Sequence, residues 1–138
     1  MGMFDVVRSD SALQISRLAL DGMALRQDLT STNVANVDTP TYKAKEVNFE
    51  TTLKQVMSGK PSPNLQLLLT NERHMDVPGS NILFKTSEDR LSTPRADGNN
   101  VDIDKEMLQM NETGVRQSAV TQLVARKLRL LKDISRVR

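Results

Sequence analysis

The side chains that could hold a metal or perform acid–base chemistry are few, and their spacing suits neither task. His74 is the only histidine and the chain contains no cysteine, so a zinc site or a thiol nucleophile cannot be assembled around it. Glu72 and Asp76 flank His74 in a stretch that we expect to be a loop. We therefore interpret His74 as a solvated or hydrogen-bonded loop residue, and we expect no metal.

The segment from Asp97 to Asp102 superficially resembles a calcium-binding loop, but its register fails. Counting from Asp97 puts Val101 where an oxygen ligand is needed and Leu108 where a bidentate glutamate is needed. A turn leading into a helix capped by Asp102 or Asp104 explains the same residues. The sequence also lacks a glycine-rich phosphate loop, a Ser–His–Asp order and paired carboxylates. It therefore predicts a protein that is no enzyme and needs no cofactor or small-molecule substrate.

Size and composition favour long helices over a compact globule. The 138 residues are 38% hydrophobic but only 3% aromatic, with a net charge of +2, so one domain spanning residues 1–138 is expected and few bulky side chains can fill a centre. The small net charge does not select nucleic acid as a partner. No apolar run reaches the length of a secretory signal or a membrane span. A cytoplasmic location is the default expectation unless a signal-independent export route exists.

The first element expected is a helix from Ser11 to Val34, within about residues 9–35. Apolar side chains recur there at helical spacing, and Ser11 with Gln14 has the spacing of a capping box. Gly22 falls on the same stripe, which suggests a spot where another helix comes close, since glycine costs about 1 kcal/mol in a helix interior. The stripe comprises Ile15, Leu18, Gly22, Leu25 and Leu29.

The last element expected is a helix over about residues 102–138, roughly 50 Å long. Its main apolar seam is predicted to consist of Leu123, Val124, Leu128 and Leu131. Six cations follow from Arg126 to Arg138 against the single acid Asp133. Two interpretations of these cations are open. They either stabilise the negative C-terminal end of the helix dipole or contact an anionic partner.

Between the helices, residues 36–101 contain all five prolines and predict a loop-rich middle. A short helix is expected near Val47–Ser58, and Leu65–Thr70 and Asn81–Thr86 are candidate strands joined by a turn at Pro78-Gly79. The predicted fold is mainly α, with the two long terminal helices packed as a coiled-coil-like hairpin around this short middle.

One motif is specific enough to suggest a family. Residues 33–44 read NVANVDTPTYKA and resemble the signature of the axial proteins of the bacterial flagellum, Asn-x-Ala-Asn-x-(Asp/Asn)-Thr-Pro-Gly-Tyr-Lys. The matching positions are Asn33, Asn36, Thr39, Pro40, Tyr42 and Lys43. Thr41 departs from the usual glycine, and threonine resists the positive φ that glycine permits. The segment from Asp97 to Met107 similarly looks like the one that opens the C-terminal helix of the rod proteins.

Physical reasoning on this motif predicts a helix stop with a defined exit path. Asn33 and Asn36 are expected to end the helix, because asparagine tolerates left-handed backbone and bonds local amides. Pro40 prevents a restart and holds Thr39 extended. Tyr42 and Lys43 are suited to amphipathic contact with a neighbouring subunit.

The resemblance implies a structural subunit of the flagellar basal body rod, located in the periplasm after type III export. It also implies helical assembly with its own copies and other rod proteins, together with contacts to the rod-base adaptor and to the membrane-ring and export-gate components. The alternative from the residues alone is a small helical binding module, such as an export chaperone or a basic nucleic-acid-associated protein.

Overall fold

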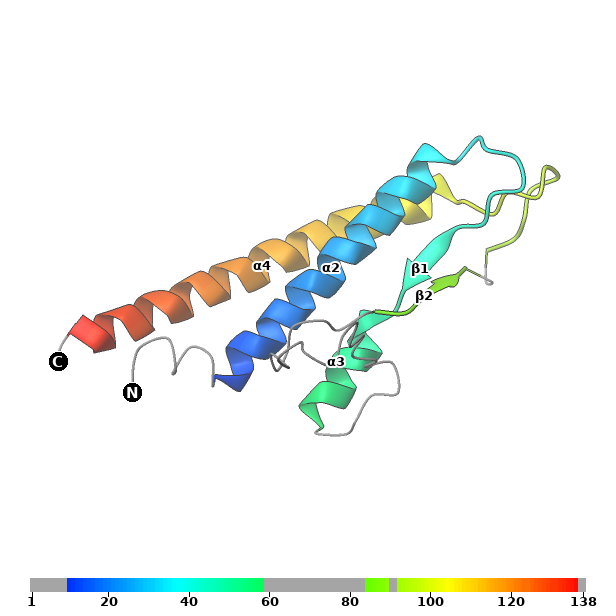
Figure 1. The fold of residues 1–138 in the computed structure, drawn as a ribbon. Helices are drawn as coiled ribbons and strands as arrows, with labels where there is room; N and C mark the ends of the chain where they lie inside the picture. The colour runs from blue at the N-terminus through cyan, green and yellow to red at the C-terminus, as the bar shows by residue number, and fades with distance from the viewer. Residues whose placement is uncertain (1–9, 59–83, 90–91, 137–138) are drawn as a thin grey trace, which may run out of the picture.

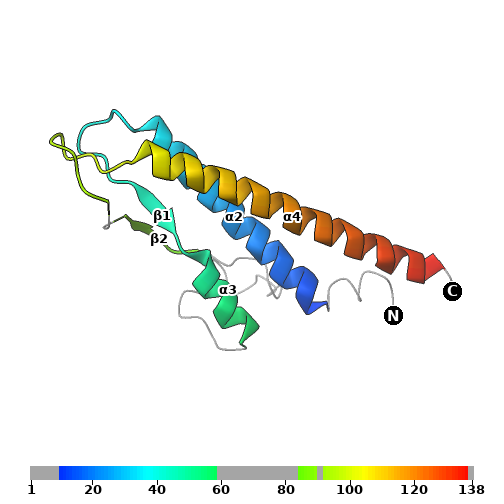
Figure 2. The same cartoon turned by 180° about the vertical axis from the view of Figure 1, so that it is seen from behind.

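Two long helices lie side by side and carry a small α/β segment along one flank (Figures 1 and 2). The computed structural model describes residues 10–58, 84–89 and 92–136. The elements are α2 (Ser11–Ala35), β1 (Lys45–Val47), α3 (Phe49–Met57), β2 (Thr86–Glu88) and α4 (Ile103–Arg136). The start of α2 and the end of α4 lie at one end, and the loops after α2 and before α4 at the other (Figure 1). The predicted mainly helical hairpin is confirmed.

The N-cap of helix α2 lies one residue before the expected cap. Asp10, not Ser11, is the N-cap, and its carboxylate accepts hydrogen bonds from the backbone N–H groups of Ala12 at 2.9 Å and Leu13 at 3.3 Å. The expected capping box of Ser11 and Gln14 is therefore wrong, because the charged side chain one position earlier takes the free N–H groups. Lys127 of α4 reaches the same carboxylate at 2.7 Å, which ties the start of α2 to the far half of α4.

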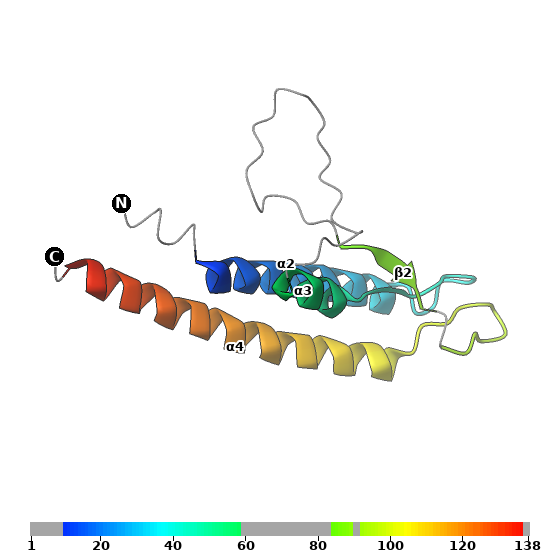
Figure 3. The same ribbon diagram turned by 90° about the horizontal axis from the view of Figure 1, so that it is seen from below.

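Helix α4 runs alongside α2 (Figure 3) and faces it with a regular heptad seam. Its N-cap is Asp102, which accepts from the N–H groups of Asp104 and Lys105, so of the two candidate caps Asp102 and Asp104 the first is correct. From there, buried and half-buried side chains recur at alternating spacings of four and three, the period of a coiled coil. They are Glu106, Met110, Thr113, Gln117, Val120, Val124, Lys127 and Leu131. Half of these side chains are polar, so the contact between the two long helices is less apolar than expected.

The apolar seam predicted on α4 is divided among different faces. Val124 and Leu131 are half-buried members of the heptad seam, whereas Leu123 is 64% exposed and Leu128 is 39% exposed. The polar residues Gln117 and Lys127 lie in the seam instead. Hydropathy alone does not predict this, because it ranks both residues below leucine. The four residues therefore do not form one continuous buried seam within the subunit.

The middle forms a two-stranded antiparallel sheet and a short helix on the flank of α2. Strand β1 pairs with β2 in the register Lys45↔Glu88, Glu46↔Ser87 and Val47↔Thr86. The expected helix near Val47–Ser58 is confirmed as α3, capped by Asn48. The candidate strand Leu65–Thr70 and the turn Pro78-Gly79 lie outside the described residues, as does His74. Of Asn81–Thr86, only Thr86 is in a strand among the residues described.

The core lies between α2, β1 and α3. Met23, Val47 and Phe49 are its buried members, and Leu53, Phe84 and Val120 pack against them. Gly22 lies directly under the Phe49 ring, and a Cβ atom there would be 2.5 Å from it. The expected close approach at Gly22 is thus confirmed, with the first residue of α3 as the neighbour. Neither long helix, over its described residues, is apolar enough for long enough to cross a membrane.

Candidate functional site: the junction of the two long helices

The chain segments that leave α2 and enter α4 are bonded to each other, and we call residues 33–45 and 95–106 the junction. The backbone N–H of Thr41 donates to the carbonyl oxygen of Asp97 at 3.0 Å, and that of Asn100 donates to the carbonyl oxygen of Tyr42 at 3.4 Å. The flagellar-type signature and the segment that opens α4 therefore fold together. Side chains add most of the remaining connections.

Asn33 connects α2, β1 and α4 at the centre of the junction. Its amide nitrogen donates to the carbonyl oxygen of Lys45 at 2.8 Å and to the carboxylate of Glu106 at 3.1 Å. Its amide oxygen accepts from the Lys45 N–H at 2.9 Å and from the Tyr42 hydroxyl at 3.2 Å. The prediction that Asn33 ends the helix is wrong, because α2 continues to Ala35 and the buried amide makes only long-range bonds.

Asn36 performs the stop that was expected of it. It is the C-cap of α2 with φ of −106°, so it ends the helix without left-handed backbone. Its side-chain amide donates to the carbonyl oxygen of Thr32 at 2.8 Å, and its side-chain oxygen accepts from the Thr39 hydroxyl at 3.1 Å. Thr39 and Pro40 are exposed, which leaves this rim of the junction accessible.

Two asparagines that we interpreted only as part of a turn fasten the second segment to the first. The fully buried Asn99 donates to the carbonyl oxygens of Asn36 at 2.9 Å, Val37 at 3.0 Å and Thr39 at 2.8 Å. Asn100 accepts from the Ala44 N–H at 2.7 Å. The only sequence signal was the pair of adjacent asparagines, which does not specify whose backbone they bond.

Thr41 adopts the conformation that its side chain disfavours. Its φ is 61°, the only positive φ of a non-glycine residue in the described ranges. Gly98 on the facing segment has φ of 82°, and a Cβ atom there would contact Thr41 at 3.6 Å. The Thr41–Asp97 backbone bond holds the strained residue in place. Thr41 therefore adopts a positive φ at the position where the family signature usually has glycine, at a cost in backbone strain.

Tyr42 and Lys43 are half-buried within the junction. The Tyr42 hydroxyl bonds Asn33, and burial together with the nearby Glu106 carboxylate raises the pKa of Tyr42. The Lys43 ammonium donates to the carbonyl oxygen of Gly98 at 2.6 Å. Both side chains thus have partners in their own subunit, and their contact with a neighbouring subunit stays a prediction.

Glu106 and Asp89 are the buried carboxylates beside the junction. Burial raises the pKa of Glu106 above its usual value, although the hydrogen bond from Asn33 acts in the opposite direction. Asp89 accepts from the Lys105 ammonium, which links the end of β2 to the first turn of α4. Nowhere in the described ranges do three His, Asp or Glu side chains gather in a way that could hold a metal ion. The junction is a network of hydrogen bonds between amide and carbonyl groups. Such a network can hold the two chain segments in a fixed geometry.

Comparison with known proteins decides the family. The chain is 31% identical over 116 residues to the flagellar basal body rod protein FlgB of Bacillus subtilis, covering 84% of this chain and 86% of that protein. It is 33% identical to FlgB of Borrelia hermsii, covering 84% and 89%, and 32% identical to FlgB of Salmonella typhimurium, covering 79% and 81%. The chain belongs to the FlgB family. No family model matches it.

As a FlgB-family protein, the chain is a structural subunit of the flagellar basal body rod. This membership does not favour the alternative of a small helical binding module. We call the paired helices α2 and α4 the shaft. The predicted α2 residues lie in the shaft and not in the junction, with Leu18 and Gly22 buried and Ile15, Leu25 and Leu29 half-buried. The structure therefore brings together Asn33, Asn36, Tyr42 and Lys43, and it leaves the apolar residues of α2 and α4 along the two helices.

Proposed function

We propose that this rod subunit assembles through the exposed apolar side chains of α4. Five large apolar side chains, each between 57% and 71% exposed, follow one another along this helix over about 40 Å. Leu108 and Val115 lie on the side of α4 opposite the heptad seam, Leu123 and Leu130 lie beside the seam, and Ile134, three residues after Leu131, continues the spacing of the seam. We call them the outer stripe: Leu108, Val115, Leu123, Leu130 and Ile134.

The outer stripe is more apolar than the seam that joins α4 to α2. Half of the seam consists of polar side chains, whereas the stripe consists of leucine, valine and isoleucine. Covering one such side chain contributes about 1.5–3 kcal/mol, so covering several of them would contribute substantially to subunit association. The observation that carries the proposal is this row of five exposed apolar side chains on a chain whose relatives are rod proteins.

The occupant of the stripe is another subunit of the same architecture, either a copy of this chain or a related rod protein. A contact between different surfaces of neighbouring subunits, repeated without closing a ring, produces an open helical assembly. A rod has this form. The helix pair is an elongated element (Figure 1), which we infer to run along such a rod, and the junction holds the pair together at one end.

The finer placement follows the family. We infer that the subunit occupies the periplasmic part of the proximal rod after type III export. Its further partners are the rod-base adaptor and the membrane-ring and export-gate components. The names of the relatives, which specify the basal body rod, support this inference.

Paired substitutions test the assembly surface. Leu123→Asp places a charge on the outer stripe, and we expect it to abolish recovery of basal bodies and swimming while the isolated subunit unfolds at nearly the unchanged temperature. Lys132→Ala removes one exposed charge beside the stripe and should change assembly little. Val124→Asp serves as the control inside the subunit, because it alters the heptad seam and should lower the unfolding temperature.

Intact rods carrying Leu123→Asp would overturn the proposal. If Lys132→Ala instead proves the more damaging substitution, the end of α4 docks electrostatically on an anionic partner.

A further inference from the structure

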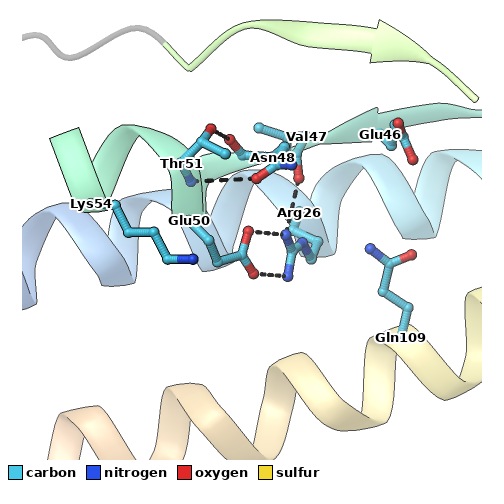
Figure 4. A pocket seen from close by; sticks show the side chains of 8 residues that line it. All are labelled: Arg26, Glu46, Val47, Asn48, Glu50, Thr51, Lys54 and Gln109. Carbon is cyan, nitrogen blue, oxygen red and sulfur yellow. Dashed lines mark hydrogen bonds and ion pairs between the residues drawn. The ribbon is translucent and has the colours of Figure 1, made fainter. Parts of the chain in front are cut away.

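A second cluster, halfway along the helix pair and separate from the junction, anchors the middle segment. Arg26 of α2 donates from its two terminal nitrogens to the two carboxylate oxygens of Glu50, at 2.7 Å and 2.6 Å. One of these nitrogens also donates to the carbonyl oxygen of Val47 at 3.0 Å. Figure 4 shows the two side chains facing each other with parallel contacts. We call Arg26, Val47, Phe49 and Glu50 the Arg26 node.

Apolar packing fixes the guanidinium from its other side. The guanidinium carbon lies 4.4 Å from the centre of the Phe49 ring, within the range of a cation–π contact. The same ring rests on Gly22 and meets Phe84 edge-on, with ring centres 6.1 Å apart. The Arg26 side chain is only 14% exposed. The guanidinium of Arg26 therefore contacts both the ring and the carboxylate at the start of α3. A lysine ammonium could not make both contacts with the same geometry.

The charges of the node are matched. Burial would raise the pKa of Glu50, but the hydrogen bonds from Arg26, a backbone hydrogen bond and the charges of Arg26 and Arg116 together hold the pKa of that carboxyl below its usual value. Arg116 of α4 approaches the same carboxylate at 3.8 Å and is itself more than half exposed. Glu50 is thus ionised and held mainly from α2.

Helix α3 is held to the rest of the subunit mainly by its contacts with α2. Among the described elements it packs on α2 and has no comparable contact with α4. A groove of about 400 Å³ opens beside the node, with Gln109 of α4 on one side and Lys54 of α3 on the other (Figure 4). The Phe49 ring fixes how closely α3 approaches α2, and the bidentate Arg–carboxylate pair constrains both the distance and the angle of the contact.

We propose that Arg26 is a positioning residue for rod assembly, which sets the angle at which α3 projects from the two-helix shaft. The junction holds the beginning of β1 through Asn33, and the Arg26 node holds its end. Together they present α3 to neighbouring subunits in one orientation. The inference rests on membership of the rod family and is independent of the outer stripe.

Spin-label distances in the full chain test this directly, because the chain contains no cysteine of its own. One label pair reports the angle of α3, through cysteines replacing the exposed Asp21 on α2 and Met57 on α3. A second pair reports the shaft, through cysteines replacing the exposed Asp28 on α2 and Ser118 on α4. Each pair is measured with Arg26, Arg26→Met and Arg26→Lys, and Arg116→Met is the matched control for charge.

We expect Arg26→Met to broaden the α2–α3 distance distribution, leave the α2–α4 distribution unchanged and greatly reduce the number of recovered basal bodies. Arg26→Lys should show the same changes to a smaller degree, and Arg116→Met should resemble the unsubstituted chain. An unchanged α2–α3 distribution in Arg26→Met would overturn the proposal. So would equal broadening of both pairs, which indicates general loss of stability, or a broadened α2–α3 distribution with normal rods.

Discussion

Asn33 on α2 donates a hydrogen bond at 3.1 Å to the carboxylate of Glu106 on α4, 73 residues further along the chain. Both side chains are buried, with Glu106 only 4% exposed. The bond joins the two long helices where they approach the junction. It also places a carboxylate where ionisation is costly, since burial disfavours the charged form.

Replacing Glu106 should therefore change how stability depends on pH. The folded-state pKa of Glu106 is raised above its unfolded value of 4.5. The contribution of this group is fully present below pH 4.5 and is lost as the pH rises through the folded-state pKa. We expect Glu106→Gln to be more stable than the unsubstituted chain at neutral pH, by about 1.4 kcal/mol for each unit by which the pKa is raised. Urea denaturation over a pH series measures it.

Glu50 provides the matched control because its pKa is displaced in the opposite direction. Its contribution is present above its unfolded value of 4.5 and is lost as the pH falls through the lower folded-state pKa. Glu50→Gln should thus destabilise the chain at neutral pH, and the difference should shrink on acidification. A stability difference for Glu106→Gln that stays constant over the whole pH series would contradict the assignment of a buried, costly charge.

Gly22 and Gly114 make a second matched pair. A Cβ atom at Gly22 would lie 2.5–2.8 Å from atoms of Phe49, whereas nothing lies within 4 Å of one at Gly114. We expect Gly22→Ala to lower the free energy of unfolding by about 1–3 kcal/mol, because the ring must move. Gly114→Ala should raise it by up to about 1 kcal/mol through helix propensity. Equal effects in chemical denaturation would mean that the Phe49 ring yields without cost.

Thr41→Gly should relieve the strained turn of the junction. A non-glycine residue in left-handed backbone costs roughly 1–2 kcal/mol, and the added freedom of glycine in the unfolded chain offsets about 0.5–1 kcal/mol of that. We therefore expect a net stabilisation of up to about 1 kcal/mol in thermal unfolding. Thr93→Gly, at an exposed loop position without positive φ, should slightly destabilise. Destabilisation of comparable size at both positions would argue against strain at Thr41.

Asn99→Ala should loosen the junction more than any substitution of an exposed asparagine. It removes the donor to three carbonyl oxygens and the acceptor for the Val101 N–H. Leaving such groups unsatisfied should cost at least about 2 kcal/mol in the free energy of unfolding. Asn111→Ala, at an exposed position within α4, should have little effect or be slightly stabilising. Hydrogen exchange of the residue 36–44 amides gives a local readout, and unchanged protection there would refute the role of Asn99.

The two long helices were predictable because their signals are local and repeated. Periodicity marked both elements to within one or two residues, and the approach at Gly22 followed from a glycine on an apolar stripe. The strand β1 was missed, since three residues carry no usable alternation and its partners in β2 lie about 40 positions further along the chain. The roles of Asn33 and Asn99 were also missed, because the sequence does not distinguish an asparagine that caps a helix from one that bonds distant carbonyl groups.

The division of the α4 surface was unpredictable for a related reason. Hydropathy ranks Leu123 and Leu128 above Gln117 and Lys127, yet the latter face α2. Which face of a helix meets its partner depends on the register set by the junction and by the Lys127–Asp10 contact at the opposite end. Apolar side chains of α4 that this register turns away from α2, such as Leu123 and Leu130, stay exposed in the single subunit.

The separation of α2 and α4 in the sequence also bears on how fast the subunit folds. The seam joins residues that lie about seventy or more positions apart in the sequence. The contact order of the subunit is therefore high for a helical protein, because the chain must close a long loop before any seam contact forms. A helical hairpin with a short turn would meet no such delay. Until residues beyond Asp102 are available, α2 lacks its principal partner, and a chain truncated before that point should remain largely non-helical in dilute solution.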